Sequence, residues 1–344
     1  MAYTTIDKSS LHFNTKFYTG TGSELAVTGV GFKPDWTWIK SRSATYDHTL
    51  YDVVRGATKQ LYSNQTNGQY TEAQGLKSFD SDGFTNGTDA KGNNNGSTYV
   101  SWNWLAGGSQ GSSNTDGSIN TTYTSVNTTA GFSICQWEGT GANATIGHGL
   151  GVVPKMYIVK NVDATNDWNV YHHSIGNTHR LFLNTTQAAE DNASAWNDTS
   201  PTSSVFSVST NTNVNQSGST MIAYVFAEKT GFSKFGSYTG NGNADGTFIY
   251  TGFKPALIII KKDATDSWFM YDNKRGDINP NAKGLTAESN AVEETSGKEI
   301  DFVSNGVKIR NSNNSINTSG STYIYMAFAE APLVGSNNIP ATAR

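Results

Sequence analysis

The sequence has 344 residues, with 24 basic against 28 acidic side chains and a formal net charge of -4, so a nucleic-acid binder with a basic footprint is not expected. A single cysteine, Cys135, excludes an intrachain disulfide framework. Only 15% of residues are charged, and the 35 glycines fall mostly in short turn-like clusters between alternating segments, which indicates a β-rich protein with a neutral polar surface.

The N-terminus and the apolar stretches predict no leader and no membrane anchor. Residues 1–8 lack the basic run and apolar region of a secretory signal. No stretch approaches the ~20 apolar residues that a membrane helix needs. We therefore expect a protein that is made in the cytoplasm and does not insert into a membrane.

One pattern of a turn, an apolar strand and a lysine occurs three times along the chain. The copies are residues 31–40 (GFKPDWTWIK), 151–160 (GVVPKMYIVK) and 252–261 (GFKPALIIIK). Each copy closes with a Gly-Ser-Thr turn and an apolar strand, at residues 96–104, 218–226 and 320–328. The sequence thus predicts three copies of one module of about 100 residues, each with its own core.

These repeats predict the domain boundaries. Module 1 covers residues 1–108, and residues 109–130, rich in Gly, Ser, Thr and Asn, are expected to form a linker or arm. Module 2 covers residues 131–232, and module 3 covers residues 233–344 with a C-terminal tail. No spacer separates modules 2 and 3, so these two are expected to pack as a rigid pair.

Within each module the apolar residues alternate. In the first closing strand Val100, Trp102 and Trp104 share one face, which predicts a core side, while Ser101 and Asn103 predict a wetter side. Asp-Gly at 82–83 and Asn-Gly at 305–306 predict hairpins, and residues 282–292 could form a short helix. The predicted fold class is all-β, with three tandem antiparallel β-sandwich modules of jelly-roll or lectin-like form.

Three segments carry a resemblance to a known family. They are residues 31–40, residues 231–242 (GFSKFGSYTGNG) and residues 323–344 (YIYMAFAEAPLVGSNNIPATAR). Over essentially its whole length the chain resembles a family of uncharacterised virion-associated proteins from tailed phages of marine bacteria. The resemblance implies a structural protein of the particle, made in the host cytoplasm and often interpreted as a tail fibre or other surface appendage. It implies no catalytic residues.

Candidate groups for catalysis or metal binding are few. His172 and His173 are adjacent, and neighbouring side chains of a strand point to opposite faces, so one strand cannot present both to a metal ion. Glu228 and Glu330 occupy equivalent places in separate modules, which would not bring them to the ~5 to 10 Å that glycoside hydrolysis requires. We expect no enzyme, no metal site and no cofactor, with a glycan depolymerase as the weakest alternative.

Ligand binding is the better candidate, at the loop after the Ala-Thr turn of each module. An aromatic ring beside Asp or Asn offers a sugar a stacking face and planar acceptors. The residues are Tyr46, Asp47 and His48 in module 1, Asn166, Asp167 and Trp168 in module 2, and Asp266 and Trp268 in module 3. The two tryptophans also start alternating apolar patterns, which favours a core position for them.

Two further predictions concern exposure to water. Trp196 lies in a polar stretch without apolar neighbours in sequence, so we expect it to be the most exposed tryptophan and a further ligand candidate. The aligned Lys40, Lys160 and Lys261 are expected at strand ends, facing water, as a requirement of the fold.

The sequence therefore favours a tail fibre or receptor-binding protein of a phage particle that acts by non-covalent binding. Its expected partners are other virion proteins, a host-surface glycan and further copies of itself, with a trimer favoured. A head decoration or cement protein is the alternative. Residues 1–13 and 333–344 are both candidates for attachment to the virion.

Overall fold

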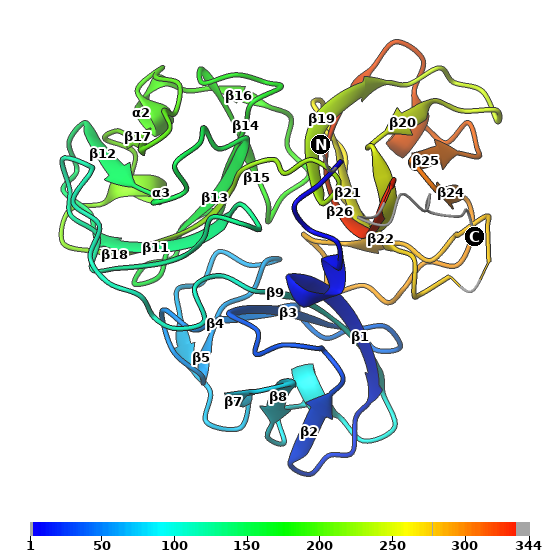
Figure 1. The fold of residues 1–344 in the computed structure, drawn as a ribbon, viewed down its shortest axis with the longest axis horizontal. Coiled ribbons are helices and arrows are strands. Elements are labelled where there is room, and N and C mark those ends of the chain that lie inside the picture. Colours follow the sequence, from blue (N-terminus) through cyan, green and yellow to red (C-terminus); the bar gives the residue numbers. More distant parts are fainter. Residues whose placement is uncertain (1–2, 277, 335–344) are drawn as a thin grey trace.

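The protein is all-β, and one strand order occurs three times around a common centre (Figure 1). The computed structural model describes residues 3–276 and 278–334, with 42% strand and 6% helix. The three lobes in Figure 1 follow the sequence, from repeat 1 in blue and cyan through repeat 2 in green to repeat 3 in yellow and red. The part of the resemblance that falls on residues 335–344 lies outside the described residues.

Repeat 1 contains a main sheet, a smaller sheet and a short pair of strands. The main sheet has the order β1 (Phe13–Thr19), β9 (Thr98–Trp104), β3 (Trp36–Ser41) and β4 (Thr49–Asp52). The smaller sheet has the order β2 (Leu25–Thr28), β8 (Gly83–Asn86) and β7 (Leu76–Asp80), and β5 (Lys59–Gln60) pairs with β6 (Tyr70–Thr71). The helical elements are η1 (Ser9–Leu11) and α1 (Ala90–Asn93).

Repeat 2 extends the same main sheet at both edges. The order is β10 (Tyr123–Asn127), β11 (Phe132–Glu138), β18 (Thr220–Phe226), β13 (Met156–Asn161), β14 (Asn169–His172), β15 (His179–Phe182) and β16 (Glu190–Asp191). The smaller sheet is β12 (Ala144–Gly147) with β17 (Val205–Val208), and the helices are α2 (Ala193–Trp196) and α3 (Thr212–Asn215). Part of the predicted linker is therefore β10, an edge strand of this sheet.

Repeat 3 returns to the order of repeat 1. Its main sheet is β19 (Ser233–Thr239), β26 (Thr322–Pro332), β21 (Phe253–Lys262), β22 (Trp268–Asp272) and β23 (Leu285–Thr286). The smaller sheet is β20 (Phe248–Tyr250), β25 (Gly306–Ile309) and β24 (Ile300–Val303), followed by α4 (Asn314–Asn317). Both predicted hairpins are confirmed, as β7–β8 and β24–β25, while the helix considered over residues 282–292 is wrong because β23 lies there.

Glycine is required at one turn of every repeat. Gly20, Gly139 and Gly240 directly follow β1, β11 and β19, and a Cβ at each would lie 2.2 Å from a main-chain oxygen just after α1, α3 or α4. Any side chain at these positions would displace that helical turn. This close approach explains why a glycine recurs at this place in all three repeats.

The main sheets are buried on both faces, which corrects the prediction of a wetter side. Trp102 and its alternating neighbours Val100 and Trp104 lie in one central cluster with their counterparts from repeats 2 and 3. The opposite faces pack under the smaller sheets in three separate clusters. Ser101 and Asn103 are also fully buried, and Asn103 Nδ2 donates to Ser101 Oγ at 3.0 Å.

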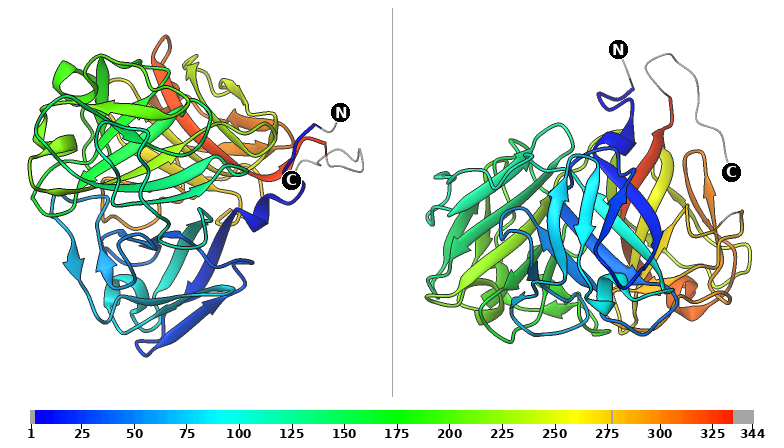
Figure 2. Two further views of the ribbon diagram at one scale, coloured as in Figure 1. Left: turned by 60° about the vertical axis from the view of Figure 1, so that its left-hand side comes forward. Right: turned by 90° about the horizontal axis from the view of Figure 1, so that it is seen from below.

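The three repeats therefore share a core, and none folds around a core of its own alone. All three pack together, so the predicted rigid pair of repeats 2 and 3 is part of a larger unit. Figure 2 shows the lobes side by side, with η1 beside the end of β26.

Candidate functional site

Three of the aromatic side chains predicted to contact a ligand, those of His48, Trp168 and Trp268, lie instead against the neighbouring repeat. Each contributes a hydrogen bond to a main-chain carbonyl there: Trp168 Nε1 to Tyr62 O at 2.8 Å, Trp268 Nε1 to Phe182 O at 2.8 Å, and His48 Nε2 to Thr286 O at 3.0 Å. All three rings are at most 1% exposed. These hydrogen bonds join repeat 2 to repeat 1, repeat 3 to repeat 2 and repeat 1 to repeat 3, so the three repeats form a closed circle. Because the three side chains are buried, they are not accessible to a sugar.

The proton position on His48 follows from its partners. Its Nδ1 accepts the indole N–H of Trp38 at 2.8 Å, so the proton of the neutral ring is on Nε2 and is donated to repeat 3. Burial lowers the pKa of His48 well below its usual range, and the nearby Lys40 lowers it further. His48 is therefore a neutral donor at the interface.

Asp47 and Asp167 hold the base of the loop within their own repeats. Asn64 Nδ2 donates to Asp47 Oδ1 at 2.7 Å, and Asn184 Nδ2 donates to Asp167 Oδ1 at 2.8 Å. Both aspartates are half-buried. Each carboxylate thus uses one oxygen to fix the loop that presents the interface ring.

Asn166 and Asp266 contact the neighbouring repeat through their main-chain amides. Asn166 N donates to Thr66 O and Asp266 N donates to Thr186 O, each at 2.8 Å. Tyr46 holds the same position in repeat 1 and is half-buried. The predicted ligand residues of the three loops are thus distributed over three interfaces and do not form one site.

Trp196 is fully buried, so the prediction of an exposed tryptophan is wrong. Its ring packs edge-on against Tyr157, with 4.9 Å between centroids, and lies close to Tyr171. Its Nε1 donates to His179 O at 3.1 Å. Strands from earlier in repeat 2 therefore supply the apolar neighbours that its own segment lacks.

The three aligned lysines are also buried, which corrects the prediction that they face water. Lys40, Lys160 and Lys261 are 0% exposed. Each ammonium donates to main-chain carbonyls at its own Ala-Thr turn, and Lys160 also donates to Thr66 O of repeat 1 at 2.9 Å. Burial lowers their pKa values to about 8, about 7 and about 8, respectively.

A second set of equivalent contacts also links the three repeats. In each, a main-chain amide donates to a main-chain carbonyl of the neighbouring repeat: Gln69 N to Val162 O at 2.6 Å, Ala189 N to Asp263 O at 2.7 Å, and Glu293 N to Arg42 O at 2.9 Å. The backbone is thus the same at all three interfaces, while the side chains above it differ.

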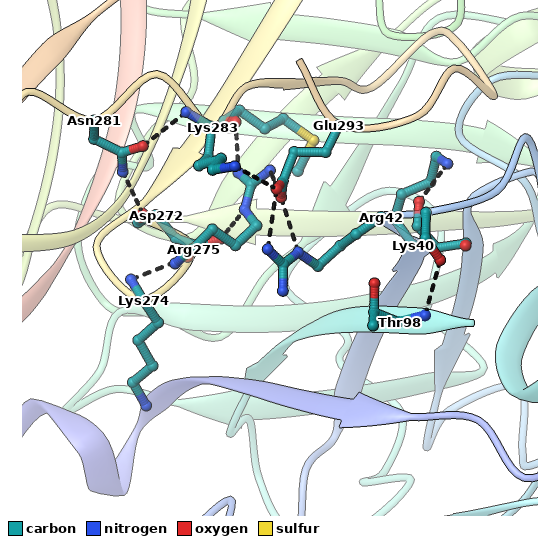
Figure 3. A network of polar contacts seen from close by, with 12 residues as sticks. Lys40, Arg42, Thr98, Asp272, Lys274, Arg275, Asn281, Lys283 and Glu293 are labelled. Carbon is teal, nitrogen blue, oxygen red and sulfur yellow. Dashed lines mark hydrogen bonds and ion pairs between the residues drawn. The ribbon is translucent and has the colours of Figure 1, made fainter. Parts of the chain in front are cut away.

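At the interface of repeats 3 and 1 a network of charged side chains crosses the boundary (Figure 3). Arg42 donates to Glu293 through Nε at 2.9 Å and through Nη2 at 3.0 Å. Arg275 Nη1 approaches the same carboxylate at 3.5 Å, and the Glu293 side chain is only 7% exposed. A buried ion network therefore closes this interface.

The interface of repeats 2 and 3 has Ala189 and Asp263 where the ion network has Glu293 and Arg42. A groove of about 400 Å³ opens there, between Ser174, Ile175 and His179 on one side and Asp263 and Thr322 on the other. Ala189 also lines this groove.

The interface of repeats 1 and 2 is open as well, and we name its cavity the repeat 1–2 groove. It has a volume of about 420 Å³ and is lined by Asn67, Gly68, Gln69, Tyr70, Val162, Asp163 and Thr165. A smaller cavity of about 190 Å³ continues it past Gln110, which comes from the segment between the repeats. Gln69 and Val162 replace the pair Glu293 and Arg42, so no ion pair forms between these two positions.

The repeat 1–2 groove is the candidate functional site, and sequence reasoning missed it. Tyr70 is 45% exposed in it. The sequence holds one signal that could have revealed the groove: Tyr70, in the Asn-Gly-Gln-Tyr stretch at 67–70, stands where repeats 2 and 3 have Glu190 and Glu294. That difference becomes visible only when the repeats are aligned through this loop.

No group of three or more His, Cys, Asp or Glu side chains within residues 3–276 and 278–334 is placed to hold a metal ion. Among the same residues, no helix has the length and apolar character needed to cross a membrane. His172 and His173 each contact a main-chain carbonyl instead, Tyr325 O at 3.2 Å and Phe235 O at 3.0 Å.

These features define an all-β protein with three interlocked repeats. Residues 8–332 match the family described as Domain of unknown function (DUF7483), and the chain belongs to that family. No curated protein matches the sequence.

Proposed function

We propose that the protein is a structural component on the surface of a tailed-phage particle, a tail fibre or receptor-binding protein that acts by non-covalent binding. The observation that carries this proposal is the closed ring of repeats. The side chains of His48, Trp168 and Trp268 hold the repeats together, as do Lys160 and the ion network of Glu293 at one interface each. This leaves a rigid body with open polar grooves at the other two interfaces. A rigid surface binds without the entropy cost of ordering loops.

A head decoration protein is the second candidate. Three similar lobes around one axis would match a position of threefold symmetry on a shell. In either role we propose that each repeat is a small β-sandwich of jelly-roll or lectin-like form. The support is that a main sheet and a smaller sheet enclose an apolar cluster in every repeat.

Immunogold labelling of intact particles with antibody against the purified protein tests the proposal. Label at the tail tip or along fibres is expected for a receptor-binding protein. Label distributed over the head would support the decoration protein and overturn the fibre. Particles without label, made by cells in which the protein is detected, would overturn both.

A further inference from the structure

The repeat 1–2 groove contains the aromatic side chain of Tyr70, which is held in place by its neighbours and remains exposed to solvent. Asn67 Nδ2 donates to the hydroxyl of Tyr70 at 2.5 Å. The ring of Tyr62, 7% exposed, lies 5.7 Å from the ring of Tyr70 between centroids. Tyr70 nevertheless keeps 45% of its surface exposed. An immobilised aromatic side chain offers a ligand contact area at little cost in conformational entropy.

The opposite wall of the groove is polar and belongs to repeat 2. Asp163 Oδ2 accepts the main-chain N–H of Thr220 at 2.6 Å, which fixes that carboxylate, and Thr165 follows on the same turn. Gly68 allows the two walls to approach, because a Cβ there would lie 2.8 Å from Val162 O. The shape of the groove is therefore fixed by contacts from both repeat 1 and repeat 2.

The tyrosine is not needed to close its own strand pair. The equivalent positions in repeats 2 and 3 are occupied by Glu190 and Glu294, which pair with Arg180 at 3.2 Å and with Lys298 at 2.8 Å. Repeat 1 has an exposed ring at that place and an open groove beside it. In repeats 2 and 3 the carboxylate at this position has a structural role in an ion pair, whereas no such role explains the exposed aromatic side chain of Tyr70.

We infer that the repeat 1–2 groove binds a neutral oligosaccharide, with the ring of Tyr70 as the stacking surface and Gln69 and Thr165 as hydrogen-bonding groups. A sugar presents an apolar ring face and a rim of hydroxyls, which matches an aromatic side chain flanked by amides and hydroxyls. The seven lining residues include the carboxylate of Asp163 and no basic side chain, and Arg55 of the adjoining cavity is only 2% exposed and paired with Asp52 at 2.5 Å, so acidic sugars are disfavoured by repulsion. This inference deepens the proposed function, from which it takes the glycan partner.

The test uses the full-length protein, titrated by calorimetry and saturation-transfer NMR with maltohexaose, cellohexaose, mannohexaose and galactohexaose. Alginate oligosaccharides of the same length are the acidic comparison. We expect millimolar or tighter binding of at least one neutral hexasaccharide, about tenfold weaker binding to Tyr70→Ala, as is usual for an aromatic hot spot, and nearly full binding to Tyr70→Phe. Tyr250→Ala is the matched control, because Tyr250 is a tyrosine of similar exposure, 53% against 45% for Tyr70, on β20 of repeat 3.

Equal binding by wild type and Tyr70→Ala would overturn the inference, as would loss of binding by Tyr250→Ala, preferential binding of alginate, or no binding of the four neutral sugars. Melting temperatures of the three variants within about 2 °C of wild type show that the effect is local. Labelling of particles is a separate measurement. A protein found on the particle that binds none of these sugars overturns the groove assignment and leaves the proposed function standing.

Discussion

Trp102 Nε1 donates a hydrogen bond to Asp272 Oδ2 at 3.0 Å, across the boundary between repeats 1 and 3. Arg275 Nε donates to the same oxygen at 2.6 Å from within repeat 3. The equivalent residues of the next boundary repeat the arrangement, because Tyr224 OH donates to Asp52 Oδ2 at 2.7 Å. A closing strand of one repeat thus satisfies a buried carboxylate of another, inside the central core.

Trp102→Phe is expected to destabilise the protein by about 1–3 kcal/mol more than Trp104→Phe, because only the first change removes a donor from a buried carboxylate. Trp104 is the matched control on the same strand and in the same cluster. Its Nε1 is buried without a hydrogen-bond partner among the described residues. Urea unfolding followed by circular dichroism measures the difference. Equal losses in the two variants would contradict a role for the hydrogen bond.

The central core also predicts how the whole protein unfolds. Residues of all three repeats meet in one cluster. In it the ring centroid of Trp36 lies 4.4 Å from that of Tyr224 and 6.0 Å from that of Phe226, and Phe226 lies 5.9 Å from Phe328. Loss of one repeat would expose this cluster to water, so the repeats are expected to unfold together. Scanning calorimetry should give a single transition with equal calorimetric and van't Hoff enthalpies. Two or three resolved transitions would show that the repeats are independent.

The repeats, the all-β class and the hairpins could be predicted because they depend on local patterns. The alternation of Val100, Trp102 and Trp104 identified a buried face, and Asp-Gly at 82–83 identified a turn. The burial of the opposite face could not be predicted. Ser101 and Asn103 are small or polar, as on a wet face, and the smaller sheet that covers them comes from elsewhere in the repeat.

The burial of the predicted ligand residues was even less accessible to sequence reasoning. His48, Trp168 and Trp268 have the composition of a sugar site, but their partners are carbonyls of another repeat, which no local pattern reveals. Trp196 has no apolar neighbours in its segment and is buried by Tyr157 from β13. Whether these side chains are exposed to water is therefore decided by contacts with residues that are distant in sequence.

His172 predicts loss of stability in acid. Its Nδ1 accepts the N–H of Ser174 at 3.2 Å, so Nε2 carries the proton that it donates to Tyr325 O. Burial lowers its pKa to about 3, and the adjacent His173 contributes to the shift. The unfolded chain, with a pKa near 6.5, therefore binds the proton first, and stability present above about pH 6.5 is lost as the pH falls toward about 3.

His172→Gln is expected to flatten the dependence of the unfolding free energy on pH over this range, because glutamine keeps a donor but does not titrate. His179→Gln, the same replacement at a half-buried histidine of the same repeat, is the control for the substitution itself. Urea titrations at a series of pH values provide the measurement. If His172→Gln and wild type lose stability in parallel, another group is responsible.

The closed ring leads us to expect a monomer, in place of the homotrimer that the sequence favours. The interface surfaces of the repeats are all used within one chain, from repeat 1 to 2, from 2 to 3 and from 3 to 1. A second copy therefore finds none of these surfaces free, as in a closed cyclic oligomer. Light scattering coupled to size-exclusion chromatography should give a mass near 37.0 kDa. A mass three times larger that persists on dilution would show that the outer surface carries a separate trimer interface.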